Sequence, residues 1–89
     1  MQNQQITIVN KLGLHARAAA KLVQTASKYE ADINISHNGK TVNGKSIMGI
    51  MMLAASKGTI IEVDCAGADE DQAMADLVQL INDRFGEDE

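Results

Sequence analysis

His15 and Arg17 are the residues best suited to chemistry, and they stand together in the stretch GLHAR, just before a run of helix-forming residues. If a helix begins at about Ala16, His15 lies at its N-terminal edge, where backbone N–H groups lack intrahelical partners and the dipole is positive. This field disfavours the imidazolium form and favours a neutral, nucleophilic ring. An anion attached to the ring would meet free N–H groups, and Arg17 could add a charge-assisted hydrogen bond. The pattern suits a residue that carries a phosphoryl group.

The helix expected after His15 has a basic face. Arg17, Lys21, Gln24 and Lys28 recur on one side, opposite an apolar stripe. An acidic chain thus has a basic rim beside its histidine, which suits contact with acidic surfaces of partner proteins. A histidine at a helix start is also often only a capping or surface residue, and the residues alone leave that interpretation open.

A second informative stretch is GKSIMGIMML, residues 44–53. Ser46 is a good N-cap for a short helix over residues 46–53. Apolar side chains surround this helix, yet a short helix on a small domain can bury only one side. We therefore expect some methionines to form an exposed, adaptable docking patch. A phosphate on Ser46 would sit at the helix N-terminus with its charge beside that patch, and could block partners without unfolding the protein.

The same region matches the phosphate-binding loop pattern G-x-x-x-x-G-K-S, as GKTVNGKS over residues 39–46. The context speaks against a nucleotide site. Such a loop follows a buried parallel strand and opens a long helix, whereas here the preceding strand alternates, Asn38-Gly39 is a hairpin signal, and the following helix is short. A nucleotide-binding protein remains an alternative that a nucleotide titration would test.

The composition narrows the class of protein. The formal net charge of −4 argues against nucleic acid as the main partner. Cys65 is the only cysteine, which suits a reducing compartment. No apolar run approaches the length of a membrane span, and the polar start MQNQQ does not resemble a signal peptide, so we expect a cytoplasmic protein. His15, His37 and Cys65 share no ligand spacing, and we expect no metal and no cofactor.

Alternation and helical periodicity predict the order strand, helix, strand, strand, helix, strand, helix. The expected strands cover residues 4–9, 31–37, 40–43 and 59–66, and the expected helices cover residues 16–28, 46–53 and a last segment that Asp69 caps and Gly86 ends. One-sided strands predict an α+β open-faced β-sandwich: a four-stranded, mainly antiparallel sheet covered on one face by three helices. We expect a single domain over residues 1–89, ordered over about 4–85, with a frayed and solvated acidic tail at 86–89.

The chain resembles HPr, the histidine-containing phosphocarrier of the bacterial phosphoenolpyruvate-dependent sugar phosphotransferase system. GLHAR followed by a helix matches the family's active-site motif, KSIMGIMML matches its regulatory-serine motif, and the element order matches its fold over about residues 4–85. The resemblance implies that His15 accepts a phosphoryl group from phospho-enzyme I and passes it to an enzyme IIA domain, with Arg17 assisting at the phosphoryl group. Such a chain is a covalent intermediate between enzymes rather than an independent enzyme.

The resemblance also implies a regulatory site and a docking surface. Ser46 would be the target of an ATP-dependent HPr kinase/phosphorylase, where the organism has one. Ile47, Met48 and Met51 would belong to the partner-docking patch, and we expect Lys21 to contribute from the basic rim. Nothing in the sequence requires an oligomer, so we expect a monomer.

One position departs from the family pattern, which usually has proline after the arginine. This chain has Ala18 there. Proline suits the first turn of a helix because its φ is fixed and its missing N–H is not needed. Two further alternatives stay open: a phosphocarrier of the nitrogen-related regulatory branch, and a small non-catalytic binding domain of α+β class in which His15 is merely a cap.

Overall fold

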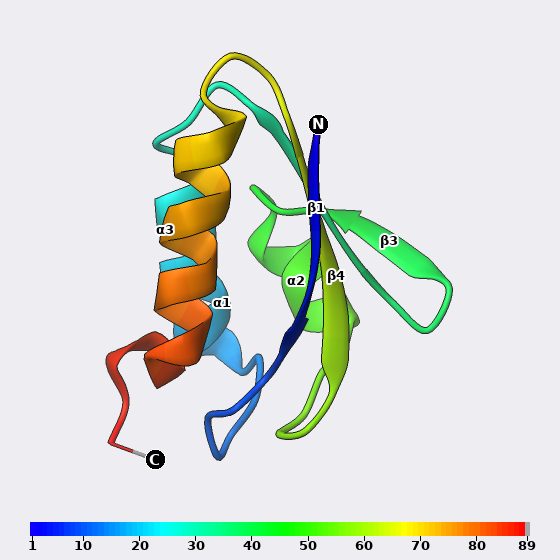
Figure 1. Cartoon of the computed structure of the whole chain (residues 1–89). Coiled ribbons are helices and arrows are strands. Elements are labelled where there is room, and N and C mark those ends of the chain that lie inside the picture. The colour runs from blue at the N-terminus through cyan, green and yellow to red at the C-terminus, as the bar shows by residue number, and fades with distance from the viewer. Residues whose placement is uncertain (89) are drawn as a thin grey trace.

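Short alternating segments form a four-stranded sheet, and three amphipathic segments form helices that pack on one of its faces (Figure 1). The computed structural model describes residues 1–88. The strands are β1 (Gln2–Thr7), β2 (Asp32–His37), β3 (Lys40–Asn43) and β4 (Ile60–Ala66). The helices are α1 (Ala16–Ala26), α2 (Ile47–Met52), α3 (Glu70–Asn82) and the 3-10 turn η1 (Arg84–Gly86).

The strands lie in the order β1-β4-β2-β3, and each neighbouring pair is antiparallel. The register places apolar residues opposite one another, with Ile6 facing Ile61 and Ile35 facing Val63. Because side chains alternate along a strand, this register directs one apolar row of each strand to the same face of the sheet. The predicted open-faced antiparallel sheet, with the order βαββαβα, is confirmed.

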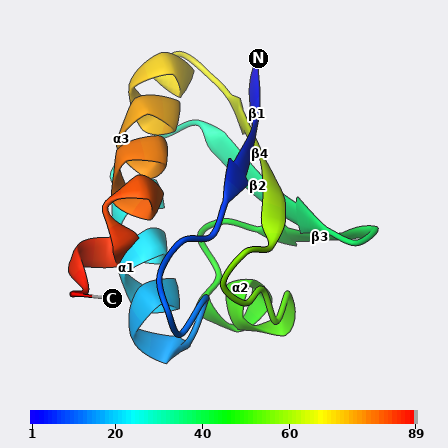
Figure 2. The same cartoon turned by 60° about the horizontal axis from the view of Figure 1, so that its bottom comes forward.

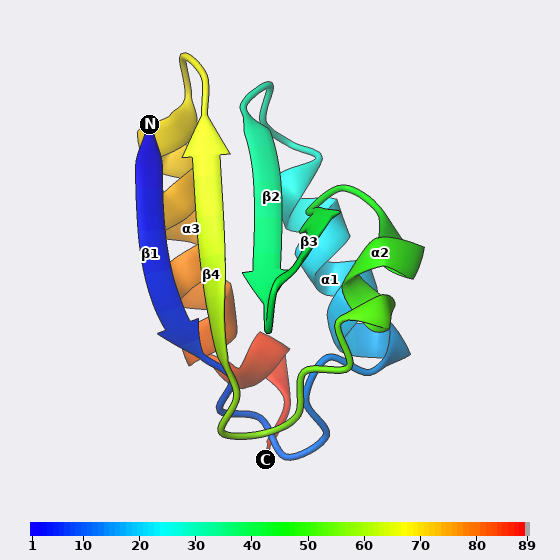
Figure 3. The same cartoon turned by 90° about the vertical axis from the view of Figure 1, so that its right-hand side faces the viewer.

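The core lies between the sheet and the helices. α1 and α3 run along the sheet, as Figure 3 shows behind the strands, and α2 packs against α1 and β3. Buried side chains from the strands meet buried side chains from the helices, namely Ile33, Ile35, Ile61, Val63 and Cys65 from the sheet and Ala19, Leu22, Leu77 and Ile81 from the helices. The core is mainly aliphatic and also contains Phe85, Met74 and Cys65, whereas the other four methionines are exposed.

Several helices end a few residues away from the ends predicted from the sequence. α1 ends at Ala26 rather than at residue 28, because the N–H groups of Lys28 and Tyr29 bond carbonyls three residues back and tighten the last turn. α3 ends at Asn82, before the predicted stop at Gly86. Arg84 and Phe85 adopt left-handed backbone angles, with φ of 56° and 54°, which turns the chain and inserts the Phe85 ring into the core.

Asp69 stands at the N-cap position of α3 as predicted, but its side chain makes no capping bond to that helix within residues 1–88. Its carboxylate instead accepts hydrogen bonds from the backbone N–H groups of Glu30 and Ala31, each at 2.9 Å. These bonds join the start of α3 to the loop before β2. The hydrogen bond from Glu30 is the largest cause that lowers the pKa of Asp69 below its usual value, and the bond from Ala31 acts in the same direction.

We predict that Asp69→Asn lowers Tm by a few degrees at neutral pH, because the amide can accept only one of the two bonds and the N–H of Ala31 is buried. A depressed carboxyl pKa stabilises the fold above the ordinary aspartate value of about 3.9, and that stabilisation is lost as pH falls through the lower folded-state value. The difference in Tm between the wild type and Asp69→Asn should therefore disappear at acidic pH. Asp32→Asn, which changes an exposed carboxyl, is the control. A difference in Tm that persists unchanged when all carboxyl groups are protonated would contradict the assignment to ionised Asp69.

Candidate functional site

His15 occupies the N-cap position of α1, as the sequence predicts. Its backbone is extended, with φ of −72° and ψ of 177°, and its carbonyl accepts the N–H of Ala19 at 2.8 Å. Within residues 1–88, however, the His15 side chain makes no capping hydrogen bond to the helix. The ring is 27% exposed and turned elsewhere, so the interpretation of His15 as a simple capping side chain does not fit this geometry.

A tight loop before α1 fixes the position of His15. Gly13 has φ of +65°, and a Cβ on it would lie 2.4 Å from the carbonyl oxygen of Ala55, so only glycine fits there. The N–H of Leu14 donates to that same Ala55 oxygen at 2.9 Å, and the Leu14 side chain is buried. The Asn10 amide donates to the carbonyl oxygen of Gly13 at 2.8 Å. These contacts seat the loop against the segment after α2.

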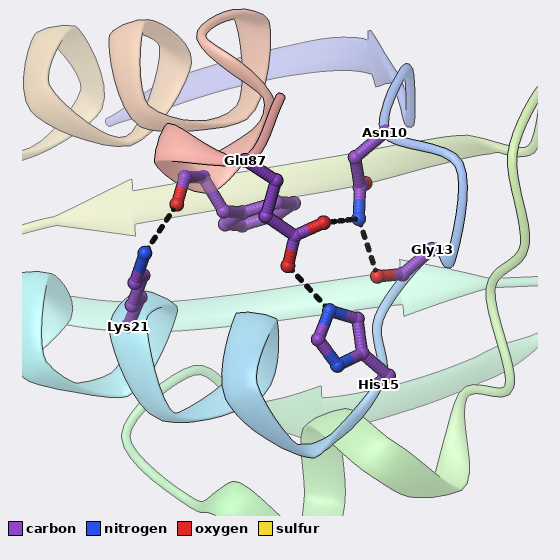
Figure 4. A network of polar contacts seen from close by, with 6 residues as sticks. Asn10, Gly13, His15, Lys21 and Glu87 are labelled. Atoms are coloured by element: carbon purple, nitrogen blue, oxygen red, sulfur yellow. Dashed lines mark hydrogen bonds and ion pairs between the residues drawn. The ribbon is translucent and has the colours of Figure 1, made fainter. Parts of the chain in front are cut away.

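The His15 ring contacts a carboxylate from the other end of the chain. Nε2 of His15 lies 2.5 Å from Oε2 of Glu87, and Oε1 of Glu87 accepts from Nδ2 of Asn10 at 3.1 Å (Figure 4). The Glu87 side chain is only 13% exposed. The expectation of a frayed, solvated tail is therefore wrong at Glu87, whereas Gly86 and Asp88 are exposed and residue 89 lies outside the described residues.

The sequence signal for this contact was weak, because 72 positions separate the two residues. Only the left-handed turn at Arg84 and Phe85 sends Glu87 back toward α1, and a left-handed backbone at two non-glycine residues cannot be read from the sequence. Lys21 Nζ donates to the carbonyl oxygen of Phe85 at 2.7 Å. Lys21, expected at the partner-binding rim, thus also fastens η1 to α1.

Charges of both signs surround the ring. Burial raises the pKa of the Glu87 carboxyl, but hydrogen bonds from His15 and then from Asn10 outweigh it, so this pKa lies below its usual value. The exposed Arg17 lowers it further by its charge. An open hollow of about 450 Å³ lies over the ring, and its lining residues are Lys11, Leu12, His15, Arg17, Glu87 and Asp88. The structure thus brings the predicted pair His15 and Arg17 to one hollow, which can hold an anion against the ring.

The second predicted motif folds as expected. Ser46 caps α2, with its Oγ accepting the N–H of Gly49 at 3.1 Å. Ile47, Met48 and Met51 are exposed, Met48 by 74%, while α2 turns its buried residue Ile50 toward the core. α2 lies beside α1 in Figure 2, and the two helices are in contact.

Two more large apolar side chains are exposed near the two motifs. Met52, on α2, is 60% exposed, and Leu12, in the loop before His15, is 66% exposed and lines the hollow beside the ring. A lone leucine in a loop gives no periodic signal, so sequence reasoning could find Leu12 only through its nearness to His15. We call Leu12, Ile47, Met48, Met51 and Met52 the apolar patch.

Other readings of the sequence find no support in the structure. Residues 39–46 form the turn and return strand of an antiparallel hairpin, followed by a helix of six residues, so the phosphate-binding loop interpretation is wrong. Another hollow, of about 360 Å³, lies around His37 on the face of the sheet away from the helices, and its lining contains no lysine or arginine to hold an anion.

Cys65 is buried in the core, and burial is the largest cause that raises the pKa of its thiol. Within residues 1–88, no three His, Cys, Asp or Glu side chains are grouped as metal ligands. Over the same residues, none of the helices is both long and apolar enough to cross a membrane.

Comparisons with known proteins agree with this geometry. The PTS-HPr family model, described as the PTS HPr component phosphorylation site, matches residues 2–83. The Phosphocarrier protein HPr of Neisseria meningitidis serogroup A is 57% identical over 89 residues, covering 100% of each chain.

Solved structures show the same fold. The crystal structure of HPr-C-His from Thermoanaerobacter tengcongensis superposes with a TM-score of 0.96 at 48% identity, covering 100% of both chains. The HPr dimer from the same organism gives a TM-score of 0.79 at 49% identity, covering 98% of this chain and 100% of that chain. Because that relative is a dimer, the monomer expected here stays a prediction. The resemblance inferred from the two motifs is confirmed, and the chain belongs to the PTS-HPr family, the HPr phosphocarriers of the phosphotransferase system.

Proposed function

We propose that this chain carries a phosphoryl group on His15, accepting it from phospho-enzyme I and passing it to an enzyme IIA domain. The observation that carries the proposal is the placement of the His15 ring at the start of α1, with Nε2 on Glu87 and the other nitrogen, Nδ1, on the ring edge turned away from Glu87 (Figure 4). Family membership supports a phosphocarrier role, and the site residues and partners are the proposal.

The contact with Glu87 indicates which nitrogen attacks. A neutral imidazole has one N–H and one lone pair, and the hydrogen bond made by one nitrogen decides which is which. A carboxylate only accepts, so Nε2 carries the proton and the lone pair lies on Nδ1. We therefore assign Nδ1 as the nucleophile.

The transfer step follows from this assignment. The Nδ1 lone pair forms the new N–P bond in line as the bond from phosphorus to the donor's histidine nitrogen breaks. Free N–H groups in the first turn of α1 and the guanidinium of Arg17 stabilise the charge on the transferring oxygens. The hollow is open, so the phosphoryl group stays accessible to the next acceptor.

The apolar patch is the docking surface in this proposal. Methionine side chains adapt to different partner surfaces, and α2 presents Met48 and Met51 beside the start of α1. Arg17 supplies positive charge at the edge of the patch, which suits acidic partners. A phosphate on Ser46, placed by an HPr kinase/phosphorylase, would set about two negative charges beside Ile47 and weaken docking.

We predict that the wild-type protein, mixed with phosphoenolpyruvate and enzyme I, gains one acid-labile phosphate that His15→Ala does not gain. Intact mass measures the product, and His37→Ala is the matched control that should keep full labelling. Incubation with sugar-specific and nitrogen-related enzyme IIA proteins then shows which branch accepts the group. Phosphate on folded His15→Ala, or none on the folded wild type, would contradict the proposal.

We predict that Ser46→Asp lowers the rate of phosphorylation by enzyme I about tenfold, roughly 1.4 kcal/mol, because a charge lies beside the docking surface. Tm should change little, since aspartate is also a good N-cap. Ser27→Asp, at the exposed far end of α1, is the control for added charge. Equal rates of phosphorylation for Ser46→Asp and Ser27→Asp would mean that charge at Ser46 does not affect docking.

We predict that Ala18→Pro keeps the fold and hydrolyses its phosphohistidine about two- to fivefold faster, the effect of one weak hydrogen bond of roughly 0.5–1 kcal/mol. Ala18 lies in the first turn of α1, where its N–H has no acceptor inside the helix and can face an anion at His15. Circular dichroism checks the fold, and the decay of the phosphorylated mass gives the lifetime. An unchanged lifetime would mean that this N–H does not reach the phosphoryl group.

A further inference from the structure

Several contacts hold Glu87 at the His15 ring, although Glu87 lies beyond the residues 2–83 that the family model matches. One carboxylate oxygen contacts Nε2 of His15 at 2.5 Å, and the other accepts from Nδ2 of Asn10 at 3.1 Å. Asn10 is fully buried and also donates to the Gly13 carbonyl, so it ties Glu87 to the loop that positions His15.

The segment that carries Glu87 is anchored to the core. Phe85 is fully buried, its carbonyl oxygen accepts from Lys21 Nζ at 2.7 Å, and the N–H of Glu87 donates to the carbonyl of Arg84 at 2.9 Å. Figure 4 shows the Glu87 side chain lying between Asn10 and the His15 ring. A carboxylate held in this way is present at the ring before any partner binds.

We propose that Glu87 is a positioning residue for phosphoryl transfer, which keeps the proton on Nε2 of His15 while Nδ1 gains and then loses the phosphoryl group. The proposal rests on the proposed function of His15. It extends that function to a residue of the C-terminal segment that neither motif contains.

The chemistry balances without movement of a proton. On attack, the Nδ1 lone pair becomes the N–P bond, the donor's N–P bond breaks, and the ring keeps its Nε2 proton and becomes a phosphorylated imidazolium. On transfer to the acceptor, the N–P bond breaks, its electron pair returns to Nδ1, and neutral imidazole leaves. The Glu87 carboxylate stabilises the positive ring between these two steps.

The other charged groups around the ring act on it in different directions. Lys11 and Arg17 line the same hollow and oppose positive charge on the ring, while Asp88 lines it with the opposite sign. Lys21 directs its ammonium to the Phe85 carbonyl. Glu87 differs from these groups because its oxygen touches the ring nitrogen itself.

The test compares Glu87→Ala and Glu87→Gln with the wild type. Glutamine keeps an oxygen that can accept from Nε2 but loses the charge, and alanine loses both. Asp83→Asn, an exposed carboxyl at the end of α3, is the control for the same change in net charge. All four proteins are full-length and carry nitrogen-15 in the histidine rings.

Two measurements are made. Proton–nitrogen correlation spectra of the unphosphorylated proteins should show a persistent Nε2–H resonance of His15 in the wild type, in Asp83→Asn and in Glu87→Gln, and its loss in Glu87→Ala. After labelling with enzyme I and phosphoenolpyruvate, transfer to enzyme IIA should slow about tenfold in Glu87→Ala and about threefold in Glu87→Gln, since a charge-assisted bond is about twice as strong as a neutral one.

A third measurement is the pH profile of phosphohistidine hydrolysis, which should not change if Glu87 has only a structural role. Its midpoint should move to lower pH in both Glu87 variants, because the protonated ring of the phosphohistidine loses its counter-charge, and should stay in place in Asp83→Asn. An unmoved midpoint with wild-type transfer rates overturns the proposal. If the folded wild type takes no phosphate, the proposed function fails, and with it the role of Glu87 in transfer, while the Nε2–H resonance still reports whether Glu87 holds the ring.

Discussion

The burial of Phe85 is the constraint on which the arrangement at His15 depends. Full burial of such a side chain stabilises the fold by about 1.5–3 kcal/mol. The two left-handed residues Arg84 and Phe85 cost about 1–2 kcal/mol each. These terms nearly cancel, so the hydrogen bond from Lys21 to the Phe85 carbonyl and those within η1, each about 0.5–1.5 kcal/mol, decide that the turn forms. Glu87 reaches the His15 ring because this small margin is favourable.

Contacts between two loops bring the motif around His15 and the motif around Ser46 to the same end of the molecule. The loop after β1 and the segment after α2 bond to each other through Leu14 and Ala55, which seats the start of α1 beside α2. A charged site and an apolar patch therefore share one end of the molecule. The hollow over the ring is open, which suits the proposed transfer of a group between proteins.

The elements of the fold were predictable where the pattern of apolar residues is local. Alternation in β2 and β4, the Asn38-Gly39 turn and the cap at Ser46 are all read within a few residues, and the structure confirms them. Asp69 shows the limit of local prediction. An aspartate before a helix predicts a cap, whereas the carboxylate of Asp69 accepts hydrogen bonds from two N–H groups that lie 38 and 39 residues away. Likewise, the residue types of His15 and Arg17 indicate their chemistry, but the partner of His15 depends on a tertiary turn that no local pattern encodes.

The site places opposite demands on the two edges of one ring. In the proposed function, the first-turn N–H groups of α1 and Arg17 would attract the phosphoryl group on Nδ1 but oppose positive charge on the imidazole. At the Nε2 edge, the Glu87 carboxylate favours that positive charge. In the proposed function, a phosphorylated imidazolium is balanced between these two groups: the amides would hold the phosphoryl oxygens, and the carboxylate would keep the leaving group neutral when the N–P bond breaks. A carrier needs this balance, because a group that either edge held too strongly could not be passed on.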